Sequence, residues 1–226
     1  MKCRAVLFDA AETLFTTRGS VGEIYGAIAR EYGSKAEPRA IQAAFVRNFS
    51  GAGPISVDNQ KLWWKDIVRR VFTEAGAVEN FDSFFDQVYD TFRDSQGWVL
   101  FPETRTVLSE LKTQGYKLGV ISNFDTRIYS VMESLAILHF FDAVTTSSET
   151  GYCKPDREIF RAAVQALGTP PSETLIVGDN IRDDVEAGIR AGLHAVLIDR
   201  SGRHLSSPIQ RISSLKELIP LLIFRP

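Results

Sequence analysis

The sequence has few cysteines, no long apolar run and no signal peptide pattern. It contains two cysteines, Cys3 and Cys153, far apart and in no metal-ligand spacing, which excludes a disulfide framework and favours a reducing compartment. No apolar run approaches the roughly 20 residues that a helix needs to cross a bilayer. The short apolar run near Met1 ends at an acid and is wrongly flanked for a signal peptide. We therefore expect a soluble, cytoplasmic protein.

The chain also lacks an excess of charge of either sign. Lys and Arg number 26 and Asp and Glu number 28, for a net charge of −2. Such a balance creates no long-range field that would attract the chain to nucleic acid or anionic lipid. Neither is an expected partner, and the sequence leaves the oligomeric state undetermined. The 226 residues, 44% of them hydrophobic, suffice for one sizeable core plus a smaller module.

What the sequence does contain is an alternation of short apolar runs and helical patterns. Helical patterns alternate with the apolar runs over most of the chain, as expected of a parallel sheet covered by helices on both faces. The predicted fold class is therefore α/β with a Rossmann-like parallel sheet. The strands are expected at 4–8, 117–122, 142–147, 174–178 and 194–198, and the helices at 103–114, 126–138, 156–167 and 182–191.

The interval 16–96 has no comparable strand signal and shows helical periodicity instead. Two helices are expected before Gly51-Ala52-Gly53-Pro54 and two after it, at 57–75 and 80–94. We predict a four-helix module inserted into the core. The domains would then be core at 1–15, helical insert at 16–96 and core again at 97–226.

Polar residues follow three of the predicted strands, and ligands of open parallel sheets bind at the carboxyl ends of the strands. Asp9 closes the first strand, Ser122-Asn123 the second, and Asp179 begins an acidic group after 174–178. Lys154 comes in the connection before that strand. A carboxylate nucleophile, a hydroxyl, an ammonium group and an acid cluster suit phosphoryl transfer, because a phosphate needs cationic and N–H partners to approach a carboxylate.

These ordered motifs resemble those of the haloacid dehalogenase superfamily, in particular members with a helical cap inserted after the first motif. The resemblance extends to the rhythmically expressed gene product-like subgroup. It implies that Asp9 is the nucleophile, forming an aspartyl-phosphate, and that Ser122 and Lys154 bind the phosphoryl group. Asn123 and Thr13 would also contact the substrate.

The same resemblance implies a Mg²⁺ site and a small phosphorylated substrate. Asp179 and Asp9 would be metal ligands, and Ala11 would offer its backbone carbonyl. The pattern Gly-Asp-x-x-x-x-Asp-x-x-Ala-Gly at 178–188 implies that Asp184 is the further acid of the metal site. Asp183, one residue earlier, could share or take that role.

Ala11 departs from the family pattern. Phosphatases of this superfamily usually carry a second aspartate there, which protonates the leaving group and later activates water. Alanine carries no proton, and a general acid–base group typically contributes about 10²–10⁴-fold in rate. Four explanations remain open: Glu12 supplies the carboxyl group, the leaving group is a good one such as an acyl or aryl phosphate, or the chemistry is that of a phosphonatase or of a dehalogenase.

The last two explanations require further residues. A phosphonatase needs a Schiff-base lysine, for which Lys61 and Lys65 are candidates. For a 2-haloacid dehalogenase, Asn180 and Asp183 match the fourth motif, and Arg39 lies near the position of a halide-binding arginine. Against this, dehalogenases have a small neutral residue at the position of Asp179, and an uncompensated carboxylate beside the nucleophile would repel the substrate's own carboxylate.

A non-enzymatic function is also open. Some superfamily members are slow or inactive proteins in which the site binds phosphate and metal while the cap makes protein contacts, and Ala11 fits such a protein. The leading hypothesis is a Mg²⁺-dependent phosphatase of a small phosphorylated metabolite, with a 2-haloacid dehalogenase and a catalytically impaired binding protein as the alternatives.

Overall fold

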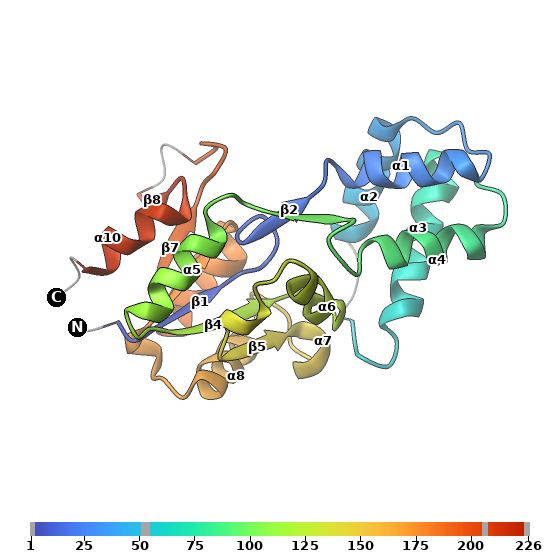
Figure 1. Ribbon diagram of the computed structural model, residues 1–226. Coiled ribbons are helices and arrows are strands. Elements are labelled where there is room, and N and C mark those ends of the chain that lie inside the picture. The colour runs from blue at the N-terminus through green and yellow to red at the C-terminus, as the bar shows by residue number, and fades with distance from the viewer. Residues whose placement is uncertain (1–2, 51–54, 205–207, 224–226) are drawn as a thin grey trace.

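The computed structural model describes residues 3–50, 55–204 and 208–223. It has two lobes, an α/β core and a helical module, which two antiparallel strands connect (Figure 1). In the described part of the chain no helix has both the length and the apolar character of a membrane span.

The core is built on one six-stranded sheet in which all neighbouring strands are parallel. The first strand of the chain is central, and later strands add first on one side of it and then on the other. The order is β5 (Ala143–Thr146), β4 (Lys117–Ser122), β1 (Ala5–Phe8), β6 (Thr174–Gly178), β7 (His194–Ile198) and β8 (Arg211–Ile212). This order confirms the predicted Rossmann-like parallel sheet. Such a sheet buries both faces of its strands, which explains why the strands are apolar throughout.

Alternate residues of β1 contribute to different layers, as the period of two in a strand requires. Val6 and Phe8 pack in one apolar cluster, with α5 (Thr104–Thr113) and α6 (Arg127–Ser134). Ala5 and Leu7 belong to the opposite cluster. The helices of that second cluster are α8 (Arg157–Leu167) and α9 (Ala187–Arg190).

Several elements differ from the sequence prediction in their limits. The helix predicted at 126–138 ends at Ser134 and is followed by a 3₁₀ turn, and the helix predicted at 182–191 begins as a wider π turn. In the tail, Ser214 and Glu217 form a capping box at the start of a short helical segment, and the short strand β8 before it was not predicted. The remaining short elements are α7 (Ser147–Thr150), α10 (Leu218–Ile223), the 3₁₀ turns Leu138–Phe140, Pro171–Glu173 and Leu215–Glu217, and the π turn Ile181–Glu186.

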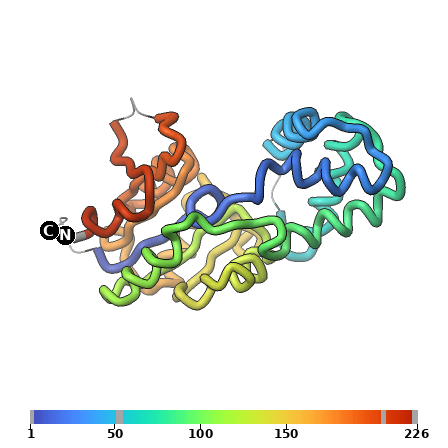
Figure 2. Tube along the Cα trace, turned by 45° about the horizontal axis from the view of Figure 1, so that its top comes forward, coloured from blue at the N-terminus to red at the C-terminus, as the bar shows by residue number. Residues whose placement is uncertain are grey.

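The helical module contains α1 (Val21–Glu31), α2 (Pro38–Ser50), α3 (Gln60–Ala75) and α4 (Phe81–Thr91), and we refer to it as the cap. Figure 2 shows the cap as a lobe at one end of the core. The helices pack through buried side chains such as Ile41, Val71 and Phe84, at the positions where the sequence shows helical periodicity. The predicted break at 51–54 lies outside the described residues.

Two short strands join the cap to the core. β2 (Phe15–Thr17) and β3 (Trp98–Leu100) pair antiparallel, with Phe15 opposite Leu100. This two-stranded ribbon, β2 and β3, lies where the sequence predicts the boundaries between the core and the helical insert. Three residues per strand are too few for a period of two to be recognised, and this explains why the ribbon was not predicted.

Candidate active site

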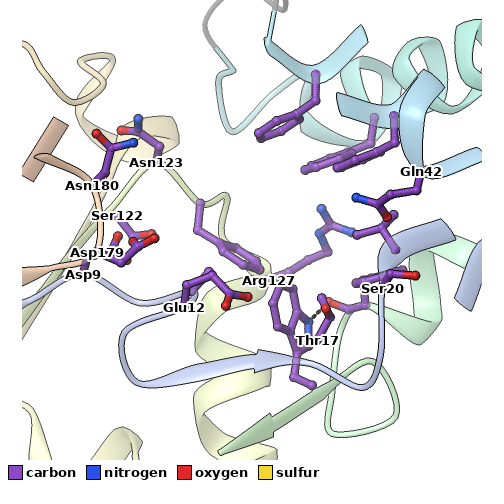
Figure 3. Close-up of a pocket in the computed structure, with 18 of the residues that line it drawn as sticks. Asp9, Glu12, Thr17, Ser20, Gln42, Ser122, Asn123, Arg127, Asp179 and Asn180 are labelled. Atoms are coloured by element: carbon purple, nitrogen blue, oxygen red, sulfur yellow. Dashed lines mark hydrogen bonds between the residues drawn. The ribbon is translucent and has the colours of Figure 1, made fainter. Parts of the chain in front are cut away.

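The carboxyl ends of β1, β4 and β6 bring the predicted chemical groups together at one edge of the sheet. Asp9 directly follows β1, and its backbone N–H donates to the Val177 carbonyl oxygen at 2.9 Å. Ser122 ends β4, and Asp179 directly follows β6. Because neighbouring parallel strands end at the same edge, these three residues line one cavity, where Figure 3 shows them close together.

Three carboxylates form a cluster beneath this cavity. Asp9, Asp179 and Asp184 each offer an oxygen, and the three oxygens lie within 4.8 Å of one another. The Lys154 ammonium group lies 2.6 Å from an oxygen of Asp9 and 2.6 Å from an oxygen of Asp184. One positive charge therefore faces three acids, and Lys154, Asp9 and Asp184 are all buried.

The excess of negative charge changes the ionisation of the cluster. Burial raises the pKa of Asp9 to about 6, an effect that Lys154 opposes and that Asp184 increases. Burial also raises the pKa of Asp179 to about 7, with the charges of Asp9 and Asp184 adding to the rise. Burial alone would lower the pKa of Lys154, but Asp184 and Asp9 outweigh it and raise that pKa. A bound cation would relieve the repulsion among the carboxylates.

The loop after β6 determines which of its two neighbouring acids joins the cluster. The Asn180 backbone N–H donates to Asp184 Oδ2 at 3.0 Å and folds the Asp184 carboxylate back toward β6. Gly178 permits this approach, since a Cβ atom there would lie 2.3 Å from Asp184. Asp183 lines the cavity but does not belong to the three-carboxylate cluster, and its Oδ1 lies 3.8 Å from Arg182 Nε.

Asn123 positions the lysine loop. Its side-chain N–H donates to the Lys154 carbonyl oxygen at 3.0 Å, and its side-chain oxygen accepts from the Lys154 backbone N–H at 2.7 Å. Both ends of the amide thus hold the backbone of the residue whose ammonium group reaches the cluster. Asn123 also lines the cavity, and its contact with substrate stays a prediction.

For Thr13 the structure differs from the prediction of a substrate contact. Its side chain is fully buried, and it is not among the residues that line the cavity. The Arg200 guanidinium donates to the Thr13 carbonyl oxygen at 2.8 Å and to Glu103 at 2.7 Å. Thr13 lies behind the Asp9 loop because the chain turns into the core directly after Glu12.

Ala11 and Glu12 form the turn after Asp9. Glu12 has φ +62°, in the left-handed region that non-glycine residues rarely adopt. This turn points the Glu12 side chain away from Asp9 and Asp179 (Figure 3), and its carboxylate accepts a hydrogen bond of 2.6 Å from the Thr16 hydroxyl. Glu12 therefore does not occupy the position of the missing acid in this conformation.

The cavity above the cluster has a volume of about 490 Å³ and extends from the core into the cap. Its core end is lined by the carboxylates, Lys154, Ser122 and Asn123. Its cap end is lined mostly by rings and apolar side chains. These are Val21, Tyr25, Phe45, Phe49, Trp64, Val68, Val88, Tyr89 and Phe92 of the cap, with Trp98 and Phe124 beside them.

Two residues that line the cavity between core and cap were not predicted from the sequence. Arg127 and Gln42 both line the cavity, and Arg127 forms a buried ion pair with Asp125, 2.7 Å between Nη2 and Oδ2. The only sequence signal was the position of Asp125 and Arg127 directly after Ser122-Asn123, where the next helix begins. A helix start explains an Asp by capping alone, so the pair did not stand out.

The arginine and lysine candidates of two alternative chemistries lie outside the cavity, whereas Asn180 and Asp183 of the dehalogenase alternative line it. Arg39 is exposed and does not line it. Lys61 and Lys65 do not line it either, and they pair with Asp86 at 2.8 Å and Asp82 at 3.0 Å. Neither a halide-binding arginine nor a Schiff-base lysine is supplied by these positions.

Comparison with known proteins identifies the family of the chain. A haloacid dehalogenase-like hydrolase model matches residues 3–192. The mouse haloacid dehalogenase-like hydrolase domain-containing protein 3 is 30% identical, over 98% of this chain and 94% of that protein. The glyceraldehyde 3-phosphate phosphatase of Methanothermobacter thermautotrophicus is 29% identical, over 87% of this chain and 85% of its own.

The predicted subgroup is matched as well. The rhythmically expressed gene 2 protein of Drosophila melanogaster is 27% identical, over 86% of this chain and 82% of that protein. A solved structure of the HAD-hydrolase YfnB from Bacillus subtilis, bound to magnesium, has a TM-score of 0.81 at 17% identity, over 99% of this chain and 100% of that one.

The fold, the Asp9 loop at the end of β1 and the acids after β6 are thus accompanied by a family match over most of the chain. With a relative of 30% identity aligned along nearly its whole length, the chain belongs to the haloacid dehalogenase-like hydrolases.

Proposed function

We propose that this hydrolase is a Mg²⁺-dependent phosphatase of a small phosphate monoester, with an aspartyl-phosphate on Asp9 as its intermediate. The observation that carries the proposal is the cluster of Asp9, Asp179 and Asp184 with Lys154, all of which line the core end of the cavity. Similarity to a named phosphatase over most of the chain supports it.

The donor set fits magnesium. Carboxylate oxygens are the ligands that Mg²⁺ prefers. Burial raises the pKa values of Asp9 and Asp179, and neighbouring carboxylates add to the rise, so a bound cation would favour the ionised forms. Asp9, Asp179 and Asp184 would hold the ion, with the Ala11 carbonyl as a further ligand. Bound Mg²⁺ would supply positive charge against the repulsion between the phosphate and these carboxylates.

The protein's own groups have separate roles in the reaction. An Asp9 carboxylate oxygen attacks phosphorus, the bond from phosphorus to the ester oxygen breaks, and the leaving group departs with the electron pair. Water then attacks phosphorus and the bond from phosphorus to the Asp9 oxygen breaks, so that the Asp9 carboxylate is restored and the phosphate leaves with the protons of the water. An ammonium group has three N–H donors; two of those on Lys154 contact Asp9 and Asp184, and the third is left for a phosphoryl oxygen, as is the Ser122 hydroxyl.

The substrate that suits this site has a leaving group that departs without protonation. Ala11 has no proton to give, and the Glu12 carboxylate is bonded to Thr16 and directed toward the cap. An aryl phosphate meets the requirement because a phenolate is a stable anion. The rings at the cap end of the cavity provide apolar surface against which such a leaving group packs.

A phosphate-binding protein without turnover is the second candidate, and the observation that favours it is the same missing acid. It differs from the phosphatase in one measurable respect, since it binds Mg²⁺ and phosphate but leaves every ester intact.

A panel of esters graded by leaving-group acidity tests the proposal. 4-Nitrophenyl, phenyl and simple alkyl phosphates are assayed for phosphate release with and without Mg²⁺. We expect Mg²⁺-dependent rates that fall steeply from the nitrophenyl to the alkyl ester. Ala11→Asp should raise the alkyl rate by about 10²-fold and the nitrophenyl rate much less, because a general acid helps the poor leaving group most.

Asp9→Asn is the control, and it should reduce the rate of every ester at least 10³-fold. Activity of this variant at the wild-type level would refute the mechanism. No phosphate release from any ester by the wild-type protein, with Mg²⁺ and phosphate still bound, would establish the binding protein instead.

A further inference from the structure

The cap end of the cavity contains hydrogen-bond donors for which the described residues supply no acceptor. Arg127 is 7% exposed, and its Nε and Nη2 atoms donate to Asp125, whereas within the described part of the chain its Nη1 atom has no acceptor. Figure 3 shows the Arg127 and Gln42 side chains directed toward each other, across the cavity from Asp9 and Asp179.

The orientation of the Gln42 amide is fixed by its other contact. The Gly22 backbone N–H needs an acceptor, and Gln42 Oε1 accepts from it at 2.8 Å. The amide N–H₂ group is therefore the end that remains for the cavity. Tyr25 lies on the same side, 3% exposed, and in the described residues its hydroxyl has no hydrogen-bond partner. Three donors from core and cap thus line one end of the cavity.

The arginine is held rigidly. Asp125, 1% exposed, takes two of its donors and also accepts from Trp64 Nε1 at 2.5 Å. The guanidinium carbon lies 4.1 Å from the ring centre of Tyr89 and 5.0 Å from that of Trp64. A guanidinium fixed on a carboxylate and between aromatic rings loses little conformational freedom when it binds a further group.

We propose that the natural substrate is an aromatic phosphate ester with a carboxylate at the end opposite the phosphate, and that Arg127 Nη1, Gln42 Nε2 and the Tyr25 hydroxyl bind this carboxylate. The inference rests on the proposed phosphatase function and names its substrate class. A carboxylate has two oxygens that accept several hydrogen bonds, and the three unused donors offset the cost of burying it. The aromatic lining between the two ends of the cavity suits a flat ring.

Binding measurements test the proposal apart from turnover. The affinities of 4-carboxyphenyl phosphate and its nearly isosteric apolar counterpart, 4-isopropylphenyl phosphate, are measured by calorimetry with Mg²⁺, in the inert Asp9→Asn protein. We expect the carboxylated ester to bind about tenfold or more tightly, as hydrogen bonds to a charged group imply.

Gln42→Glu is a discriminating variant. It keeps the oxygen that accepts from Gly22 and replaces the free N–H₂ donor by a carboxylate oxygen, whose negative charge would repel the carboxylate of the ester. The affinity ratio of the two esters should then fall at least tenfold. Gln165→Glu, the same change at an exposed position outside the cavity, is the matched control and should leave the ratio unchanged. Tyr25→Phe, which removes one hydroxyl, should lower the ratio about threefold and serves if Gln42→Glu fails to fold.

Equal affinity for the two esters, or a ratio that neither Gln42→Glu nor Tyr25→Phe alters, would overturn this inference. If the wild-type protein still releases phosphate from both esters, the phosphatase proposal stands even though this inference fails. Conversely, selective carboxylate binding without phosphate release from any ester supports the recognition site and contradicts the phosphatase.

Discussion

The two ends of the cavity differ in their balance of positive and negative charge. At the core end, Asp9, Asp179 and Asp184 face a single ammonium group, and the pKa values of Asp9 and Asp179 are raised to about 6 and about 7. At the cap end, Arg127 is matched by Asp125 in a buried ion pair. The core end thus has an unbalanced charge that a cation relieves, whereas the cap end is balanced without a ligand.

This difference matches the proposed division between a catalytic end and a recognition end. The core end derives from loops that follow three neighbouring strands, so its residues are fixed by the edge of the sheet. The cap end combines Arg127 of the core with Gln42 and Tyr25 of the cap, so it depends on how the two lobes pack. Changes at the core end should therefore alter metal binding strongly, and changes at the contact between the lobes should not.

The largest effect is expected for Asp184→Asn. Removing one carboxylate from the cluster should weaken Mg²⁺ binding by about 10–100-fold, a typical loss for a group that supports a metal site. Asp183→Asn is the matched control, because Asp183 is the neighbouring acid and lies outside the cluster. Its effect should stay within about threefold in calorimetric titration. The reverse order of the two variants would assign the metal to Asp183.

An intermediate effect is expected from pH. The raised pKa values mean that the folded protein holds protons on Asp179 and Asp9 below about 7 and about 6, and a metal must displace them. Mg²⁺ affinity should fall about tenfold per pH unit between 7 and 6 and more steeply below 6.

The same shifts determine the sign of the stability change. A carboxyl group whose pKa is raised in the folded state stabilises the fold fully at pH values below its pKa in the unfolded state. This contribution to stability is lost as the pH rises through the pKa of the folded state. The contribution of Asp9 and Asp179 to metal-free stability therefore falls between about pH 4 and 7, and the increase in Tm caused by Mg²⁺ should be larger at pH 8 than at pH 5.5. An increase that is independent of pH would contradict an ionising metal site.

The smallest effect is expected at the contact between cap and core. The Gln60 side chain donates to the Thr126 hydroxyl at 2.7 Å and accepts from the Thr126 backbone N–H at 3.2 Å. Gln60→Met should lower the free energy of unfolding by about 1 kcal/mol, the net value of such bonds, as measured by urea denaturation. Mg²⁺ affinity should remain as in the wild type, and a tenfold loss would show that the two ends of the cavity are coupled.

The sequence predicted the core end better than the cap end. Apolar runs that close on polar residues identify strand ends locally, so Asp9, Ser122 and Asp179 were found without any contact information. Thr13 was misplaced because it follows the motif in sequence but turns into the core behind it. Arg127 and Gln42 did not stand out in the sequence, since an arginine at a helix start and a glutamine within a helix have ordinary local explanations.

The sequence by itself determined the parallel α/β order of elements, the four cap helices and the types of chemical group at the strand ends, because a period of two or 3.6 and the end of an apolar run are local properties. Only the tertiary structure decided that Asp184 joins the cluster in place of Asp183, through the close approach over Gly178. It alone directed Glu12 away from Asp9 and brought Arg127 to face Gln42. These outcomes depend on a backbone turn and on the packing of cap against core, which join residues that are distant in the chain.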